Sequence, residues 1–196
     1  DQEEAMTMAD TVAVMNHGRI EQMGPPAAMY DLPVTAFVAN FVGQSNLGRG
    51  RITDRDGDFL VVDVHGSTVK VPHRRSQVQS GDILFGVRPE KVRIHRDRPT
   101  GVGNDMAATV LDVSFTGVAT QYLVTVASGA TWSVYEQNLD VEPIDLKPGD
   151  RVWMSWDPGH AFGVPAENAE VPQGPVLASE ATSSDPSSGP ALQDAQ

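Results

Sequence analysis

A series of short apolar runs, each bounded by turn-forming residues, follows Gly48 and constrains the fold more than any other feature. Residues 60–64 alternate between apolar and other side chains before the turn His65-Gly66, and residues 69–71 alternate after it. A two-residue period is typical of a half-buried β-hairpin. Further runs predict strands at 83–87, 92–94, 107–115, 121–126, 131–135 and 151–156. Strands this short at this spacing favour a small β-barrel over a sandwich of two large sheets.

Two of these runs begin in the same way. Gly81-Asp82 precedes the run at 83–87, and Gly149-Asp150 precedes the run at 151–156. A recurring step of this kind indicates a duplicated unit.

The first 46 residues follow a different pattern. Residues 2–9 have helical spacing, and Asn16-His17-Gly18 is a turn cluster between two extended runs, which predicts a hairpin. Pro25-Pro26 suits the first turn of a helix that continues through Tyr30. A second helix is predicted with Phe37, Val38, Phe41 and Val42 on one face, ending at Gly43.

Composition sets limits on function. The chain has a net charge of −12, and its last 31 residues contain five acids and no Lys or Arg. A net acidic chain argues against nucleic-acid binding, whose main energy comes from basic side chains on phosphates. Residues 166–196 are rich in Pro, Ser and Gly with isolated apolar residues, so we expect a disordered acidic tail.

Two further absences narrow the possible sites. The chain has no Cys, which excludes disulfides and thiolate metal sites, and its five His lack zinc-ligand spacing, so we expect no metal. No apolar run approaches the length of a membrane-spanning helix, so direct membrane insertion is not expected.

Three segments together resemble one protein family. The stretch from Asp1 to Asn46 resembles the end of the nucleotide-binding domain of ABC-importer ATPases of the polyamine, iron, sulfate and maltose type. Phe85-Gly86-Val87-Arg88-Pro89-Glu90-Lys91-Val92 is similar to the Arg-Pro-Glu step of the TOBE regulatory domain that follows in those proteins. The segment 113–122 resembles the second half of the same domain. Their order along the chain is the order in the family.

The resemblance implies a mainly β fold: a small OB-like β-barrel, the TOBE domain, preceded by a short α/β remnant of an ABC ATPase domain. It implies domains at 1–46 and 47–165, followed by the tail at 166–196. It also implies a regulatory and dimerisation role in the ATP-binding subunit of an importer, with a homodimer and membrane-embedded permease subunits as partners. The location would be cytoplasmic, peripheral to the membrane through the transporter complex.

Catalysis is not expected of this chain by itself. The sequence contains no phosphate-binding loop with its Lys-Ser/Thr. Gly101-Val102-Gly103-Asn104 contains glycines, but no Lys-Ser/Thr pair follows it. ATP and Mg are therefore expected for the parent subunit and no cofactor for this chain. The stretch Gly43-Gln44-Ser45-Asn46 is most similar to polyamine importers, so spermidine or putrescine is the predicted solute, although iron, sulfate and sugar importers share much of this pattern.

Two groups of residues are candidate sites. Arg88, Pro89 and Glu90 form the predicted structural and regulatory motif. Arg88 and Glu90 could hold a ligand, but an ion pair between them at the strand end is the expectation. The family resemblance makes Ser114, Thr116 and Gly117 candidate ligand-binding residues, because related TOBE domains bind oxyanions at such turns. A simple turn that needs a glycine with positive φ is the alternative.

One alternative function and one structural question stay open. The chain could be a free-standing TOBE-type small-ligand, or oxyanion, sensor; a phosphate loop upstream in the parent gene would argue against that. Trp132, Trp153 and Trp156 fit either the core or an interface with a second subunit, since large aromatic rings favour interface cores.

Overall fold

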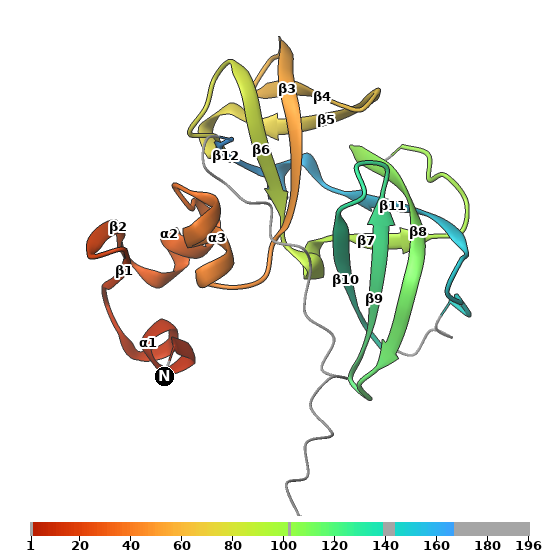
Figure 1. Ribbon diagram of the computed structural model, residues 1–196, viewed down its shortest axis with the longest axis horizontal. Coiled ribbons are helices and arrows are strands. Elements are labelled where there is room, and N and C mark those ends of the chain that lie inside the picture. Colours follow the sequence, from red (N-terminus) through yellow and green to blue (C-terminus); the bar gives the residue numbers. More distant parts are fainter. Residues whose placement is uncertain (1, 102, 139–143, 167–196) are drawn as a thin grey trace, which may run out of the picture.

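The computed structural model describes residues 2–101, 103–138 and 144–166 (Figure 1). The helices are α1 (Gln2–Met8), α2 (Pro26–Asp31) and α3 (Ala36–Phe41), with 3-10 helices η1 (His73–Arg75), η2 (Pro89–Lys91) and η3 (Pro158–His160). The strands are β1 (Val12–Asn16), β2 (Arg19–Gly24), β3 (Asn46–Asp56), β4 (Phe59–Val64), β5 (Ser67–Pro72), β6 (Gly81–Val87), β7 (Arg93–His95), β8 (Asn104–Phe115), β9 (Ala119–Val126), β10 (Thr131–Gln137), β11 (Arg151–Trp156) and β12 (Phe162–Pro165).

The N-terminal segment, residues 2–45, contains the predicted helices and hairpin. Strands β1 and β2 are antiparallel, and their turn places His17 and Gly18 at positive φ. Val14 of β1 packs with Met29 of α2 and with Val38 and Val42 of α3 in a small apolar cluster. Figure 1 shows α2 and α3 between this hairpin and the β-barrel.

Helix α3 buries a different face from the predicted one. Val38 and Val42 are buried as expected, together with Ala39, but Phe37 and Phe41 are 39% and 44% exposed. The two phenylalanine rings stack on each other, with centroids 5.8 Å apart. The small side chain of Ala39 lets α3 lie close to the elements packed against it. The large rings of Phe37 and Phe41 lie at the side of this contact.

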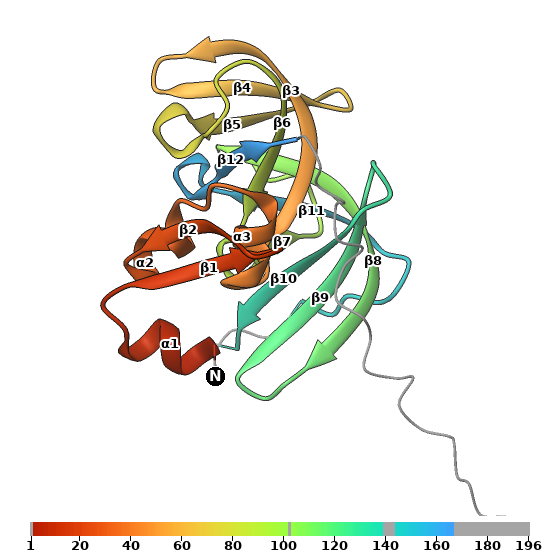
Figure 2. The same ribbon diagram turned by 60° about the vertical axis from the view of Figure 1, so that its left-hand side comes forward.

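The barrel consists of two five-stranded antiparallel sheets (Figures 1 and 2). The first sheet has the order β12-β6-β3-β4-β5 and the second has the order β10-β9-β8-β11-β7. Strand β7 follows the first four strands in sequence but pairs with β11 of the second sheet, and the final strand β12 returns to pair with β6 of the first. Each sheet is therefore completed by a strand from the other half of the chain. This is the mainly β, OB-like barrel that the sequence predicts.

The halves that supply these sheets are similar in detail, as the repeated Gly-Asp step indicates. Gly81, the first residue of β6, and Gly149, two residues before β11, both have positive φ. The first long strand of each half, β3 and β8, has a register shift at an equivalent place, between Ile52 and Asp54 and between Val110 and Asp112.

Two buried asparagines connect the halves reciprocally. At the start of β3, the amide of Asn46 donates to the carbonyl of Ser133 in β10 (2.7 Å) and accepts from its N–H (2.8 Å). At the start of β8, Asn104 makes the same pair of bonds with the backbone of Lys70 in β5. Each side chain thus binds the N–H and the carbonyl of one residue in the other sheet, so these peptide groups stay hydrogen-bonded.

The main core lies between the sheets and contains two of the three tryptophans. Phe85, Trp132 and Trp156 are in mutual ring contact, and the indole N–H of Trp132 donates to the carbonyl of Leu47. Trp153 is partly buried beneath the guanidinium of Arg98. The barrel itself therefore covers Trp132 and Trp156, and neither is available to a second subunit.

The sequence patterns located most strands but gave no bounds for β3 or β12. Strand β3 contains Arg49, Gly50 and Arg51 and lacks clear alternation, and β12 contains Gly163 and ends at Pro165. The predicted disordered tail lies outside the described residues except for Ala166, which is buried and accepts a hydrogen bond from Arg49.

Candidate functional site

Arg88 forms the centre of a joint between the N-terminal segment and the barrel. It follows the last residue of β6, and Pro89, which has no N–H to continue the ladder, begins η2. The Arg88 side chain is only 3% exposed. A buried guanidinium is stable only where its donors are used, so its partners identify the purpose of the site.

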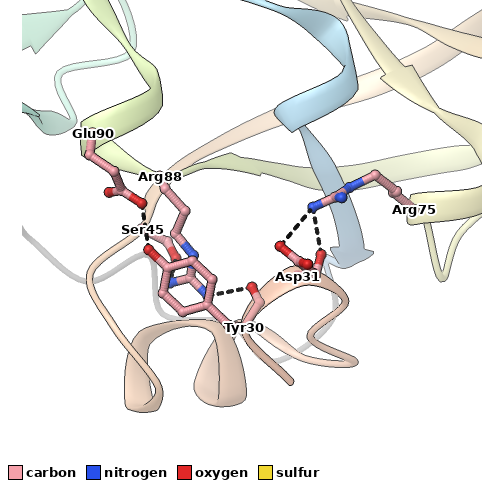
Figure 3. Close-up of polar contacts among 6 residues, drawn as sticks. All are labelled: Tyr30, Asp31, Ser45, Arg75, Arg88 and Glu90. Carbon is pink, nitrogen blue, oxygen red and sulfur yellow. Dashed lines mark hydrogen bonds and ion pairs between the residues drawn. The ribbon is translucent and has the colours of Figure 1, made fainter. Parts of the chain in front are cut away.

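The guanidinium of Arg88 binds the end of the N-terminal segment (Figure 3). Nη1 lies 2.8 Å from the carbonyl oxygens of Ala39 and Gly43 and 3.1 Å from that of Gln44. It also lies 2.7 Å from the Ser45 hydroxyl. Nη2 donates to the carbonyl of Tyr30 at 2.8 Å. These acceptors lie between 43 and 58 residues before Arg88 in the chain, so one side chain holds both helices and the linker after them.

Tyr30 stands between Arg88 and Glu90. Its ring stacks on the guanidinium, 4.0 Å from centroid to Cζ, and its hydroxyl donates to Glu90. The expected direct ion pair between Arg88 and Glu90 was therefore wrong. The carboxylate instead accepts a hydrogen bond from the hydroxyl of Tyr30, whose ring stacks on the arginine.

A second arginine binds the end of helix α2. Nη2 of Arg75, the last residue of η1, donates to the carbonyl of Asp31 at 2.7 Å and lies 3.8 Å from its carboxylate. Arg75 and Arg88 therefore contact carbonyls of consecutive residues at the C-terminal end of α2. Cations at that end complement the partial negative charge of the free carbonyls.

The linker from α3 to β3 is also bound from the second sheet. The Tyr135 hydroxyl in β10 donates to the side-chain carbonyl of Gln44 at 2.7 Å, and Asn46 bonds to Ser133 in the same strand. Residues 43–46 thus all take part in hydrogen bonds to the barrel. The joint leaves little freedom for the barrel to rotate relative to α2 and α3.

The electrostatics of the joint follow from burial. Burial lowers the pKa of Arg88, while Tyr30, Glu90 and Asp31 act in the opposite direction. Burial, followed by the hydrogen bond to Glu90, raises the pKa of Tyr30 to about 12. The phenol therefore stays protonated and can donate to Glu90 at neutral pH.

Glu21 and Gln22 of β2 stabilise the connection between α2 and α3. Hydrogen bonds from Thr35 and then Asn16 lower the pKa of the Glu21 carboxyl. Gln22 donates to the carbonyl of Leu32 and accepts from the N–H of Val34. The hairpin thus positions the helices that Arg88 binds.

The candidate ligand residues lie elsewhere, at the exposed β8–β9 turn. The Ser114 hydroxyl donates to the Asp112 carboxylate, and the Thr116 hydroxyl donates to the carbonyl of Ala119. Gly117 has a φ of 84°, as the turn alternative requires. A role for Ser114, Thr116 and Gly117 in ligand binding stays a prediction.

A recess of about 610 Å³ lies between η2 and η3. Its lining includes the cations Lys91 and Arg93 and the acids Glu90 and Asp157. These opposite charges balance, so the recess indicates no particular class of ligand.

Two other features are absent from the described ranges. There, no cluster of His, Asp and Glu has the arrangement of a metal site. No helix in the part of the chain that the structure describes is both long and apolar enough to cross a membrane.

Comparisons with known proteins agree with the motifs. Residues 85–164 match the family model of the TOBE domain. The chain is 39% identical over 166 residues to the spermidine/putrescine import ATP-binding protein PotA of Thermobifida fusca, a match that covers 84% of this chain and 43% of that protein. The PotA proteins of Acidothermus cellulolyticus and Thermotoga maritima are 37% and 35% identical, over 88% and 83% of this chain and 46% and 45% of theirs.

The chain carries a TOBE domain and is similar to the ATP-binding subunits of ABC importers. It corresponds to their C-terminal part and spans less than half the length of these relatives. The fold is also similar to that of ModG, a cytoplasmic molybdate-binding protein solved with molybdate bound. That likeness has a TM-score of 0.51 at 18% identity and covers 61% of this chain and 96% of ModG, so it concerns the fold alone.

The partners of Arg88 could not be predicted from local sequence patterns. The Arg-Pro-Glu motif was identified, but Tyr30, Arg75 and Tyr135 were not. Tyr30 lies at the end of a predicted helix, and Pro89-Glu90 follows a predicted strand, yet no local pattern connects them. The stacking partner is visible only when the two segments lie side by side.

Proposed function

We propose that this chain is the C-terminal regulatory and dimerisation part of the ATP-binding subunit of a spermidine or putrescine importer. A mechanical role, in which the barrel moves together with helices α2 and α3, is supported by one observation. Arg88 donates hydrogen bonds to Tyr30, Ala39 and residues 43–45. Because the barrel is held on α2 and α3, motion of these helices is passed to the barrel without loss at a flexible linker. The PotA relatives support the choice of solute.

The remaining parts of the importer are proposed for the parent subunit. ATP and Mg would bind in its upstream part, and permease subunits in the cytoplasmic membrane would be its partners. The parent would therefore lie on the cytoplasmic side, peripheral to the membrane. For the chain of residues 1–196 alone, we expect no ATP turnover above a buffer blank, since it contains no phosphate-binding loop.

Homodimerisation is proposed through the exposed apolar tip of β8 and β9. Leu111, Phe115 and Val118 are 47%, 69% and 82% exposed there. In a two-fold dimer the same patch of each copy meets its counterpart, and an exposed apolar patch of this kind can form such a contact. Sedimentation at tens of micromolar is the direct test: the wild-type chain should form a dimer that Phe115→Ser disrupts and Met23→Ser, an equally exposed change on the hairpin, does not.

The test of the mechanical role uses the complete importer in vesicles. We expect Arg88→Ala in the parent subunit to lower the amount of spermidine imported for each ATP hydrolysed, because the barrel no longer follows the helices. Arg74→Ala is the matched control, since Arg74 is an exposed barrel arginine that forms an ion pair with Asp58. Equal import ratios for the two variants would refute the role of the joint.

A further inference from the structure

The recess between η2 and η3 contains cations that the barrel itself does not neutralise. Net charge alone assigns no ligand to this recess, but the partners of its individual groups do. Lys91 ends η2 and Arg93 begins β7, and both side chains line the recess and are exposed. Within residues 2–101, 103–138 and 144–166, neither has an ion-pair partner. The β7 side of the recess therefore offers two cations to a ligand.

The two acids of the recess are engaged to different degrees. Glu90 accepts a hydrogen bond from the hydroxyl of Tyr30 and so belongs to the joint. Asp157 precedes η3, and its Oδ1 accepts from the N–H of Gly159 at 2.7 Å, which leaves its second oxygen without a partner in the described part of the chain. We therefore assign the negative end of the recess to Asp157, on the η3 side.

Two almost fully buried residues of β11 also line the recess. Ser155 and Trp156 are only 4% and 3% exposed. The Ser155 hydroxyl lies 2.8 Å from Nε2 of His95, so it has a partner. The indole N–H of Trp156 is buried and has no acceptor among the described residues. A buried donor of this kind costs stability unless a group from outside the chain accepts from it.

We propose that the recess binds a small zwitterion with one carboxylate and one ammonium group, the chemistry of a free α-amino acid. The carboxylate accepts from Lys91, Arg93 and the indole N–H of Trp156, and the ammonium group donates to the free oxygen of Asp157. Each end of such a ligand meets the opposite charge, which is why the lining carries both signs. A simple anion would instead place its whole charge beside Asp157 as well.

The size of the recess agrees with this class of ligand. Its volume of about 610 Å³ lies within the range of small-molecule sites and leaves room for an amino-acid side chain. The site goes beyond the proposed function, because barrel residues alone line it and binding needs neither ATP nor the transported solute.

Nuclear magnetic resonance of the isotope-labelled chain tests the proposal through its three tryptophan indole N–H signals. The common L-amino acids are added one at a time at millimolar concentration, and Trp156→Phe assigns the signal of Trp156. We expect at least one amino acid to shift that signal saturably. The signal of Trp132, whose N–H is already bound to the carbonyl of Leu47, should stay in place. Absence of a saturable shift with every amino acid would overturn the proposal.

Derivatives of the tightest-binding amino acid test the two ends of the ligand separately. Its amide lacks the carboxylate, and the corresponding deaminated acid lacks the ammonium group. Each should bind about tenfold or more weakly than the amino acid, because each loses a hydrogen bond between charged groups. Equal binding of the deaminated acid, or of inorganic phosphate, would identify a simple anion site and would also overturn the proposal.

Substitutions test the matching ends of the recess. Lys91→Gln with Arg93→Gln should weaken binding of that amino acid by about tenfold or more, and so should Asp157→Asn, which keeps an oxygen for the N–H of Gly159. Arg74→Gln with Arg151→Gln is the control, since both arginines are exposed on the barrel outside the recess. The Trp132 signal reports whether each variant is folded. Unchanged affinity in the recess variants, or an equal loss in the control, would contradict the assigned roles.

Discussion

The guanidinium carbon of Arg88 lies 4.0 Å from the centre of the Tyr30 ring, and the same tyrosine donates its hydroxyl to Glu90. One aromatic side chain of the N-terminal segment thus connects two residues of the Arg-Pro-Glu motif. The relationship makes the motif a joint between parts of the molecule, and it leads to the first two predictions.

Replacing Arg88 should destabilise the protein strongly. Arg88→Ala leaves the carbonyls of Tyr30, Ala39 and Gly43 without their donor in buried or partly buried surroundings, and we expect a loss of about 3 kcal/mol. Arg88→Lys should recover only part of this, because an ammonium cannot reproduce the planar fork of donors. Urea unfolding measures both, with exposed Arg74→Lys as the control. A value for Arg88→Lys equal to that control would contradict the account.

Alkaline pH should weaken the joint through Tyr30. Its pKa is raised to about 12 in the folded protein, above the reference value of 10.0. Between these values the unfolded state has lost the phenol proton and the folded state has kept it, so the free energy of unfolding falls as pH rises. Unfolding of the wild type and Tyr30→Phe from pH 9 to pH 12 measures this contribution. The difference between the two proteins should be constant below about pH 9 and change above it.

The two asparagines that connect the halves should each matter for stability. Asn46→Ala removes both hydrogen bonds to the backbone of Ser133, and Asn104→Ala removes those to Lys70. Because the freed backbone groups are buried or partly buried, we expect each change to cost about 2 kcal/mol. Gln137→Ala, at an exposed strand end, serves as the comparison in chemical denaturation. A cost near zero for both asparagines would show that water replaces them without penalty.

The β4–β5 turn offers a stabilising change. His65 has a φ of 51° and Gly66 a φ of 84°, the geometry for which Asn-Gly is the preferred sequence. We expect His65→Asn to stabilise by about 0.5 kcal/mol, because Asn tolerates the left-handed region better. Gly66→Ala should destabilise by about 1 kcal/mol from backbone strain alone, since an added Cβ meets no atom within 4 Å.

Thermal unfolding of the turn variants needs one control for the glycine effect. Gly24 at the end of β2 also has open space around an added Cβ but has no positive φ. Gly24→Ala should therefore be neutral or slightly stabilising. Equal losses at Gly24 and Gly66 would show that strain is not the cause.

Local patterns predicted most of the regular structure. Alternation at 60–64 and 69–71 located β4 and β5, and the glycine-containing turns placed the hairpins, because side-chain period and φ preference act within a few residues. Strand β3 was not delimited, since Arg49 and Arg51 lie in it beside glycines. Its place is set by pairing with β4 and β6 on its two sides.

The sequence alone therefore specified the strands, the turns, the family motifs and the importance of Arg88. The tertiary structure decided which face α3 buries and which partners Arg88 takes. The physical reason is the range of the interactions: a turn depends on neighbouring residues, whereas a buried guanidinium must find acceptors wherever folding brings them. For Arg88 those acceptors come from Tyr30, Ala39 and the linker at 43–45, far away in the chain and adjacent in space.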